Sequence, residues 1–152
     1  PGEMGADRVA DAVAALAQYP VPLVIIDMGT ATTLSVINRN KQYLGGIIMP
    51  GVGVSHDSLI ARTAQLPKIA LEPPKHVIGK NTIDCMKSGL LFGTACSLDG
   101  LIDRIQAELG EPCTVVATGG LATVIVPLCK HPMILDDDLL LKGLMILYHR
   151  NQ

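Results

Sequence analysis

The chain has 152 residues, a length typical of one domain of medium size. Hydrophobic residues make up 49% and charged residues 17%, which supplies a sizeable core and argues against a disordered chain. The formal net charge is −2 without a basic stripe, so the charge gives no support for nucleic-acid binding. Aromatic residues amount to only 3%, so we expect an aliphatic core.

Hydrophobic periodicity predicts the elements, beginning with a helix over residues 6–18 that ends before two prolines. An aliphatic run at 23–26 is short enough for a buried strand and leads into a turn at Asp27. Two strand-like runs, 32–38 and 42–49, then flank a polar turn, which indicates a β-hairpin. The remaining predictions are a helix at 55–63, an extended loop at 66–79, a long helix at 81–109 broken near Gly100, a strand at 113–117, a short helix at 121–128, a small strand at 133–135, and a last helix that starts at the acidic residues 136–138 and runs to 150.

This order of elements predicts an α/β layer fold with a mixed sheet. A doubly wound parallel sheet fits less well, because helices and strands do not alternate strictly. No apolar run is long enough to span a membrane, and no signal peptide is recognised, so we expect a cytoplasmic protein without membrane contact. The four cysteines are scattered without zinc-ligand spacing, and we expect them to be buried free thiols.

The turn after the first predicted strand could carry chemistry. Asp27 would project a carboxylate from the end of a rigid strand, and Gly29 would let the backbone approach a phosphate. The hydroxyl groups of Thr30, Thr32 and Thr33 could donate to phosphate oxygens, and the carboxylate could hold a cation. An ordinary hairpin turn capped by these side chains is an equally good interpretation of this motif alone.

A second turn of this kind follows the strand at 113–117. Thr118, Gly119 and Gly120 lead from the strand into a predicted helix, where bare backbone could admit a nucleotide. A tight strand-to-helix turn would give the same pattern. The two turns together resemble the second phosphate loop and the adenosine loop of the superfamily that contains actin, sugar kinases and Hsp70.

A third group, Gly5-Ala6-Asp7-Arg8, lies at the start of the first predicted helix. A carboxylate beside a guanidinium could serve as a general base and a substrate anchor. The alternative is a helix cap beside a solvated arginine, and the local sequence alone favours that alternative.

In order and spacing, seven sequence blocks resemble the type III pantothenate kinases and the related Bvg accessory factor proteins. The resemblance spans nearly the whole chain, and seven ordered blocks are far more specific than any one motif. The blocks are Gly5-Ala6-Asp7-Arg8, Asp27-x-Gly-Thr-Ala-Thr-Thr, residues 45–51, residues 62–67, residues 78–82, Ser88-Gly89 and Ala117-Thr118-Gly119-Gly120.

The resemblance implies an actin-like ATPase fold and the reaction of ATP with pantothenate to give ADP and 4′-phosphopantothenate, the first step of coenzyme A synthesis. It assigns Asp7 as the general base toward the primary hydroxyl group of pantothenate. Gly5, Ala6, Asp7 and Arg8, together with Thr82, would bind that substrate.

The resemblance also implies the cofactors. ATP would be accompanied by Mg²⁺, and Asp27 would bind a monovalent cation, K⁺ or NH₄⁺. Thr30 would contact the ATP phosphates, while Gly119 and Gly120 would border the adenosine. Residues 45–51 would lie at the interface of a homodimer.

The family begins with a strand and an Asp-x-Gly-Asn-Thr-Asn phosphate loop that this sequence does not contain. We therefore expect residues 1–152 to form one domain, the C-terminal half of a two-domain kinase plus its linker helix, and activity to require the other half. Two alternatives stay open: a non-enzymatic regulatory member like the Bvg accessory factors, and another small-molecule kinase of the same superfamily.

Several further residues have more ordinary interpretations. We expect the histidines to lie mostly on the surface, the acidic residues 136–138 to form a solvated helix start, and Asp99 and Asp103 to share a solvated helix face. Gly89 and Gly93, four residues apart, are expected to permit close helix packing.

Overall fold

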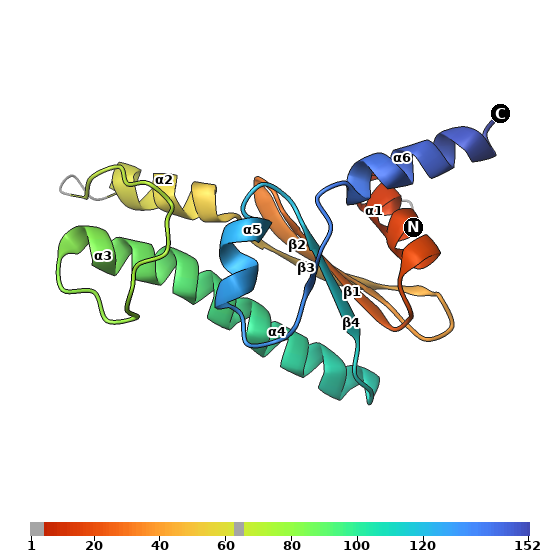
Figure 1. Ribbon diagram of the computed structural model, residues 1–152, viewed down its shortest axis with the longest axis horizontal. Coiled ribbons are helices and arrows are strands. Elements are labelled where there is room, and N and C mark those ends of the chain that lie inside the picture. Colours follow the sequence, from red (N-terminus) through yellow and green to blue (C-terminus); the bar gives the residue numbers. More distant parts are fainter. Residues whose placement is uncertain (1–4, 63–65) are drawn as a thin grey trace.

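The computed structural model describes residues 5–62 and 66–152. Its centre is a five-stranded mixed sheet with the strand order β3-β2-β1-β4-β5, crossed on both faces by helices (Figure 1). β1 pairs antiparallel with β2 and parallel with β4. The strands are β1 (Leu23–Met28), β2 (Ala31–Ile37), β3 (Tyr43–Pro50), β4 (Thr114–Thr118) and β5 (Ile134–Leu135).

The helices confirm the predicted order. The first, α1, spans the predicted residues, and the last, α6, packs beside it at one end of the molecule (Figure 1). The helices are α1 (Ala6–Gln18), α2 (Val52–Arg62), α3 (Thr82–Lys87), a π-helical turn (Ser88–Phe92), α4 (Gly93–Leu109), α5 (Ala122–Ile125), a 3₁₀ turn (Val126–Leu128) and α6 (Leu139–Arg150). Position 63 of the predicted 55–63 helix lies outside the described residues.

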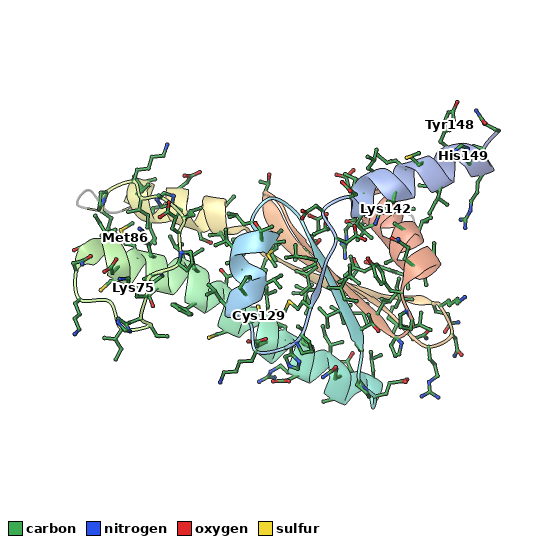
Figure 2. The ribbon with its side chains drawn as sticks, viewed as in Figure 1. Lys75, Met86, Cys129, Lys142, Tyr148 and His149 are labelled. Carbon is green, nitrogen blue, oxygen red and sulfur yellow. The ribbon has the colours of Figure 1, made fainter. Side chains whose placement is uncertain are left out.

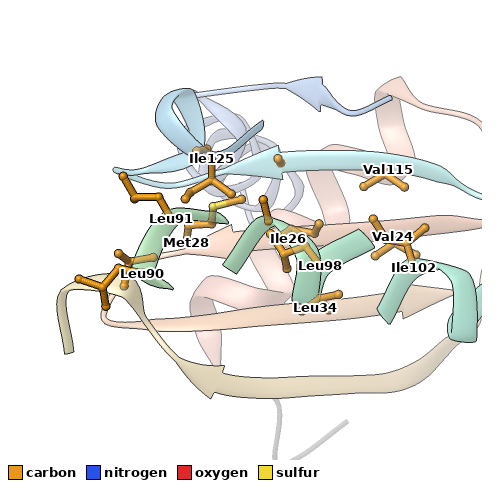
Figure 3. Close-up of a cluster of buried hydrophobic side chains, with 14 of the residues drawn as sticks. Val24, Ile26, Met28, Leu34, Leu90, Leu91, Leu98, Ile102, Val115 and Ile125 are labelled. Carbon is orange, nitrogen blue, oxygen red and sulfur yellow. The ribbon is translucent and has the colours of Figure 1, made fainter. Parts of the chain in front are cut away.

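Alternation along β1 divides the core into two layers, as expected for a strand covered on both faces. Leu23 and Ile25 face α1, while Val24 and Ile26 face α4. Figure 3 shows the larger layer, in which aliphatic side chains of the sheet pack against those of the π-helical turn and α4. The aliphatic core is confirmed, and each fully buried leucine or isoleucine stabilises the fold by about 1.5–3 kcal/mol.

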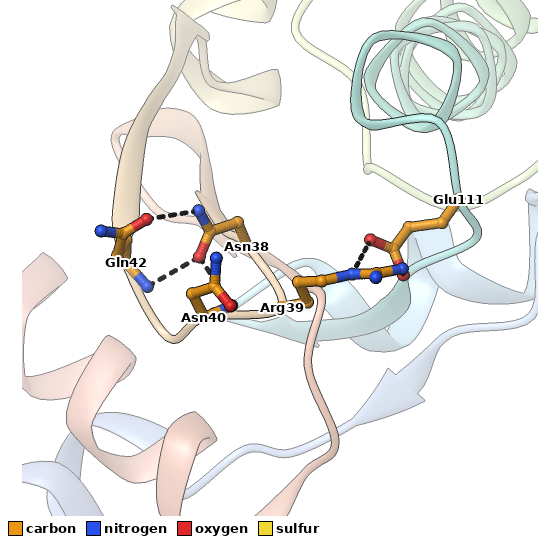
Figure 4. A network of polar contacts seen from close by, with 5 residues as sticks. All are labelled: Asn38, Arg39, Asn40, Gln42 and Glu111. Atoms are coloured by element: carbon orange, nitrogen blue, oxygen red, sulfur yellow. Dashed lines mark hydrogen bonds and ion pairs between the residues drawn. The ribbon is translucent and has the colours of Figure 1, made fainter.

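The β2–β3 hairpin is confirmed, and its polar turn is internally bonded. The side-chain oxygen of Asn38 accepts hydrogen bonds from the backbone N–H groups of Asn40 and Gln42, at 3.0 and 2.9 Å. Arg39 donates two hydrogen bonds, of 2.8 and 2.9 Å, to Glu111, which follows α4 (Figure 4). The hairpin is therefore tied to the turn that leads into β4.

The predicted break at Gly100 is wrong, because the long helix changes its hydrogen-bonding pattern at Ser88–Phe92 instead. The Ser88 hydroxyl group there donates to the carbonyl oxygen of Val77. Gly100 lies exposed inside α4, where a helix tolerates glycine at a cost of about 1 kcal/mol. No atom lies within 4 Å of an added β-carbon at Gly89 or Gly93, so their expected close packing is also wrong within the described residues.

Two predictions of solvated acidic residues need correction, and one histidine is an exception to the expected surface positions. Asp136 is buried, and its carboxylate accepts a 2.6 Å hydrogen bond from Tyr19 and forms a 3.1 Å ion pair with Lys142, which Figure 2 labels on α6. His56 is also buried, and its Nε2 atom accepts from the backbone N–H of Ile69. Asp99 is not simply solvated, because its carboxylate accepts from the backbone N–H groups that follow the 3₁₀ turn.

The cysteines are free thiols, as predicted, but they are less buried than expected. Cys85 and Cys96 are exposed, while Cys113 and Cys129 are half-buried. Among the described residues, no helix is both long enough and apolar enough to cross a membrane.

Candidate active site

Parallel pairing of β1 with β4 brings the two glycine turns to the same edge of the sheet. Asp27 is the register partner of Thr118, so the turn after each strand leaves the sheet at the same level. A hollow of about 420 Å³ lies there, lined by Asp27 and Thr118, by Gly119 and Gly120, and by side chains from α5 and the start of α6. Three of the predicted site residues therefore share one cavity.

Gly119 is required by this turn for two reasons. Its φ of +104° is a conformation that residues with a β-carbon rarely adopt. A β-carbon at this position would also lie 2.6 Å from the backbone nitrogen and oxygen of Met28. Gly120 has open space where its β-carbon would be, so the steric demand falls on the first glycine alone.

The side chain of Asp27 faces α1, because successive side chains of a strand point to opposite faces and Asp27 therefore shares a face with Leu23 and Ile25. Asp11 of α1 meets it there and shares a side-chain hydrogen bond with it. Asp7 lies one helical turn before Asp11 and is exposed. Three carboxyl groups therefore gather where α1 crosses the end of β1.

Burial is the largest cause that raises the pKa of Asp11, and together with the hydrogen bond to Asp27 and the charges of Asp27 and Asp7 it brings that pKa to about 8. Asp11 is only 2% exposed. Its Oδ1 atom and the Thr32 hydroxyl are the fully buried side-chain oxygens without a hydrogen-bond partner in the described ranges. Thr32 pairs with Met28 and so lies on the opposite face of the sheet.

Arg8 is held in place by the sheet rather than solvated. Its Nη2 atom donates a 2.7 Å hydrogen bond to the hydroxyl group of Tyr43, and its Nε atom donates a 3.3 Å bond to Ser35. The guanidinium carbon also lies 5.9 Å from the centre of the Tyr43 ring. The solvated arginine of the alternative interpretation is therefore wrong, and the cap position of α1 belongs to Gly5, without a side-chain hydrogen bond.

Thr30 is exposed in the turn between β1 and β2, three residues after Asp27, which lines the hollow. Its carbonyl oxygen accepts a 3.1 Å hydrogen bond from the backbone N–H of Gly51, which joins this turn to the start of α2. The Thr30 hydroxyl is thus carried by a turn that is fixed at both ends, close to the level of Asp27.

Thr82 is the one predicted site residue that the chain does not bring near the others. It begins α3, at the end of the molecule opposite to α1 and α6 (Figure 1). A separate hollow of about 530 Å³ lies beside it, lined by residues 79–82, Cys85 and Met86 and by Leu59 of α2. Asn81 caps the helix by accepting a 2.8 Å hydrogen bond from the backbone of Asp84.

Sequence reasoning missed Asp11, Tyr43 and Ser35. Asp11 did carry a signal, because it is a carboxylate on the face of an alanine-rich helix that also bears Ala14 and Ala15, both buried. Tyr43 and Ser35 become partners of Arg8 only through the hairpin register, which the sequence alone does not specify to the residue.

The residues present suit ATP and a cation to different extents. The hollow beside Gly119 and Gly120 offers backbone that a nucleotide can approach. The orphaned Asp11 oxygen beside Asp27 suits a cation. In the part of the chain that the structure describes, no three histidine, cysteine, aspartate or glutamate side chains converge to hold a metal ion. A divalent ion would therefore find few protein ligands here.

Comparisons with known proteins identify the family of the chain. A family model described as type III pantothenate kinase matches residues 1–104. A type III pantothenate kinase of Rhodospirillum rubrum is 47% identical over the whole chain, which covers 59% of that relative. One of Exiguobacterium sibiricum is 48% identical, again over the whole chain and 60% of the relative. The chain therefore spans about three fifths of the length of these relatives.

Solved structures show the fold. A Campylobacter jejuni protein, described as a conserved Baf family transcriptional activator, aligns with a TM-score of 0.68 at 23% identity, over 98% of this chain and 65% of that one. The ethanolamine utilization protein EutJ of Carboxydothermus hydrogenoformans aligns with a TM-score of 0.54 at 18% identity, over 90% and 50%. The predicted actin-like ATPase fold is confirmed. With its family model matched over more than half of its length, the chain belongs to the type III pantothenate kinase family.

Proposed function

We propose that the full-length protein carrying this chain transfers the γ-phosphoryl group of ATP to the primary hydroxyl group of pantothenate, giving ADP and 4′-phosphopantothenate. Membership of the family supports the reaction. The observation that supports its location is the pairing of Asp27 with Thr118, which sets both glycine turns and the carboxyl groups of α1 at one sheet edge. The reducing cytoplasm, where free thiols persist, is the compartment that we propose for it.

In this proposal Asp7 is the general base. Its exposed carboxylate accepts the hydroxyl proton while the hydroxyl oxygen forms a bond to the γ-phosphorus, and ADP leaves with the bridging oxygen. Arg8, fixed by Tyr43 and Ser35, anchors the substrate beside that base, because a guanidinium binds carboxylate and hydroxyl oxygens well. Gly5 and Ala6, exposed at the helix start, complete this side of the substrate pocket.

We assign the nucleotide to the other side of the same edge. Gly119 and Gly120 border the adenosine in the 420 Å³ hollow, and the exposed Thr30 hydroxyl contacts the phosphates. Asp27 holds a monovalent cation, K⁺ or NH₄⁺, whose positive charge offsets the negative charge of the phosphates. Mg²⁺ enters with ATP. Every protein group named here is held by the end of a strand or by α1.

The distance of Thr82 from Asp7 supports a homodimer as part of the proposal. If both residues bind pantothenate, the pocket must combine α1 of one copy with α3 of another, because they lie at opposite ends of this chain (Figure 1). The edge strand β3 offers a surface for such an assembly, since Leu44 and Ile48 are 54% and 68% exposed.

The rest of the relatives' length supports a further element of the proposal. The sheet described here provides one wall of a nucleotide site, and we propose that the remaining two fifths of a full-length protein provides the first phosphate loop on the opposite wall. Residues 1–152 then form the C-terminal half of a two-domain kinase, with α1 as the linker helix.

The test is a pantothenate-dependent ADP-release assay in K⁺, run on the full-length protein and on this chain side by side. We expect release from the full-length protein only, with the mass of pantothenate increased by that of one phosphoryl group. A folded full-length protein that releases no ADP would overturn the proposal in favour of the regulatory alternative. Turnover of a sugar but not of pantothenate would favour the other kinase alternative.

A further inference from the structure

Asp11 is a buried carboxyl group with an incomplete set of hydrogen-bond partners. The side chain is 2% exposed, and its Oδ1 atom has no hydrogen-bond partner within the described residues. Leaving a buried polar oxygen unpaired costs free energy, and buried polar groups in native proteins nearly always have a partner. A buried carboxyl group that lies beside a second carboxyl group and has one oxygen without a partner therefore indicates a missing ligand.

Neighbouring basic side chains do not pair with Asp11 in the described residues. Arg8, the basic residue of the same helix, directs two of its donors to Tyr43 and Ser35. The ion pairs found in the described ranges join Arg39 to Glu111, His131 to Asp103 and Lys142 to Asp136, and none of them includes Asp11 or Asp27. No basic side chain in the described residues therefore forms an ion pair with Asp11 or Asp27, and a bound cation would supply the positive charge that these side chains do not.

We propose that Asp11 is a second ligand of the cation at Asp27, which thereby joins helix α1 to the end of strand β1. The identity of the cation as K⁺ or NH₄⁺ rests on the proposed function. The contact between the two carboxyl groups and the free Oδ1 atom of Asp11 do not.

Of the carboxyl groups at this corner, Asp11 and Asp27 interact directly, whereas Asp7 is exposed one helical turn away, and a pair of carboxyl groups suits a monovalent ion. A Ca²⁺ site takes six to eight oxygen ligands that usually include several carboxylates, and no such cluster occurs in the described part of the chain. Backbone oxygens and water at the rim of the neighbouring hollow can complete a looser shell. Binding of a divalent ion is kept as an opposing outcome of the test.

The proposed ligand has a consequence for the active site. Asp11 is four residues after Asp7, so the two side chains lie on the same face of α1. A cation held by Asp11 and Asp27 would fix the helix that carries both the proposed base and Arg8. Asp11 is therefore a positioning residue, and a requirement for K⁺ would come partly from ordering α1.

The experiment measures the melting temperature of the full-length protein without ATP or pantothenate, in KCl and in choline chloride of equal ionic strength. At tenfold its dissociation constant, K⁺ should raise the melting temperature of the wild type by about 3–6 °C. Asp11→Asn should lose this rise. Asp57→Asn, the same change at an exposed position of α2, should keep it.

A second measurement needs no variant. Hydrogen exchange of the backbone amides in residues 6–18 should slow in K⁺ relative to choline, whether or not Asp11→Asn folds. An equal K⁺ shift in wild type and Asp11→Asn, unchanged exchange in α1, or a larger shift with MgCl₂ than with KCl would overturn the proposal. An Asp11-dependent K⁺ shift without pantothenate phosphorylation would instead keep the cation site and remove the proposed function.

Discussion

The guanidinium group of Arg8, on the first helix, is held 2.7 Å from the hydroxyl group of Tyr43, on the edge strand β3. The two residues are 35 positions apart, and the contact crosses from α1 over the sheet to the outermost strand of the hairpin. A β-carbon at Gly46 would lie 2.8 Å from the same Arg8 nitrogen, so the strand leaves room for the arginine. The hairpin therefore sets the position of the proposed substrate anchor.

Tyr43→Phe should weaken pantothenate binding while leaving ATP binding unchanged. A hydrogen bond to a charged group contributes about 1.5–3 kcal/mol, so KM for pantothenate should rise roughly tenfold or more, with a smaller change in kcat. Steady-state kinetics of the full-length protein measure both. Tyr148→Phe, at an exposed position on α6, is the matched control, and an unaltered KM in Tyr43→Phe would show that Arg8 does not depend on this contact.

Gly120→Ala and Gly119→Ala should separate ligand binding from folding. Gly119→Ala must place a β-carbon against Met28 in a left-handed conformation and should destabilise the protein by about 1–3 kcal/mol. Gly120→Ala has room in the chain itself and should melt like wild type, yet raise KM for ATP. Thermal unfolding and ATP titration measure the two effects, and normal ATP affinity in Gly120→Ala would remove this turn from the nucleotide site.

Gly143→Ala should be among the more destabilising single changes in the helical layer. A β-carbon there would overlap the backbone carbonyl group of Ala10, so α6 and α1 would have to separate. We expect a loss of about 1–3 kcal/mol in the free energy of unfolding, measured with urea. Gly100→Ala, in open space on α4, should instead gain up to about 1 kcal/mol, and equal effects of the two changes would refute the close approach of α1 and α6.

Asp136 should stabilise the protein at neutral pH but not in acid. Burial alone would raise the pKa of Asp136, but hydrogen bonds from Tyr19 and Lys142 outweigh it and lower that pKa. A carboxyl group with a lowered pKa in the folded state stabilises above its unfolded value of about 3.9, and the contribution disappears as the pH falls through the lowered value.

Asp136→Asn should therefore cost about 1.5–3 kcal/mol at pH 7, and the difference from wild type should shrink below about pH 4. Urea unfolding at a series of pH values measures this difference. Asp137→Asn, at the exposed neighbouring position, controls for the charge at the start of α6. A penalty independent of pH would show that the Asp136 carboxylate does not act through its ionised form.

Much of the fold could be predicted because local patterns and tertiary packing agree. The helix at 6–18 and the hairpin have clear periodicity and turn residues, so their bounds are correct to within about one residue. The break at Ser88–Phe92 could not be predicted, because Gly100 is the stronger local signal and the observed change depends on the Ser88 contact with a distant loop.

The site was predictable only where a motif carries it. Asp7, Asp27 and Gly119 belong to local motifs, whereas Asp11 depends on which face of α1 is buried. Asp136 was misinterpreted because three consecutive acids suggest a solvated segment, while a partner 117 positions away, Tyr19, determines its burial. Contacts across the sheet and between terminal helices are decided by register and docking, which local sequence does not encode.

The most direct test of the proposed active site is the kinetics of Asp7→Asn in the full-length protein, with ATP binding measured alongside. Loss of a general base lowers turnover by about 10²–10⁴-fold, so kcat should fall by that factor while the dissociation constant for ATP stays near that of wild type. Asp57→Asn, on exposed α2, should keep normal turnover. A kcat for Asp7→Asn equal to that of wild type would contradict the account and reduce Asp7 to an exposed acid in the first turn of α1.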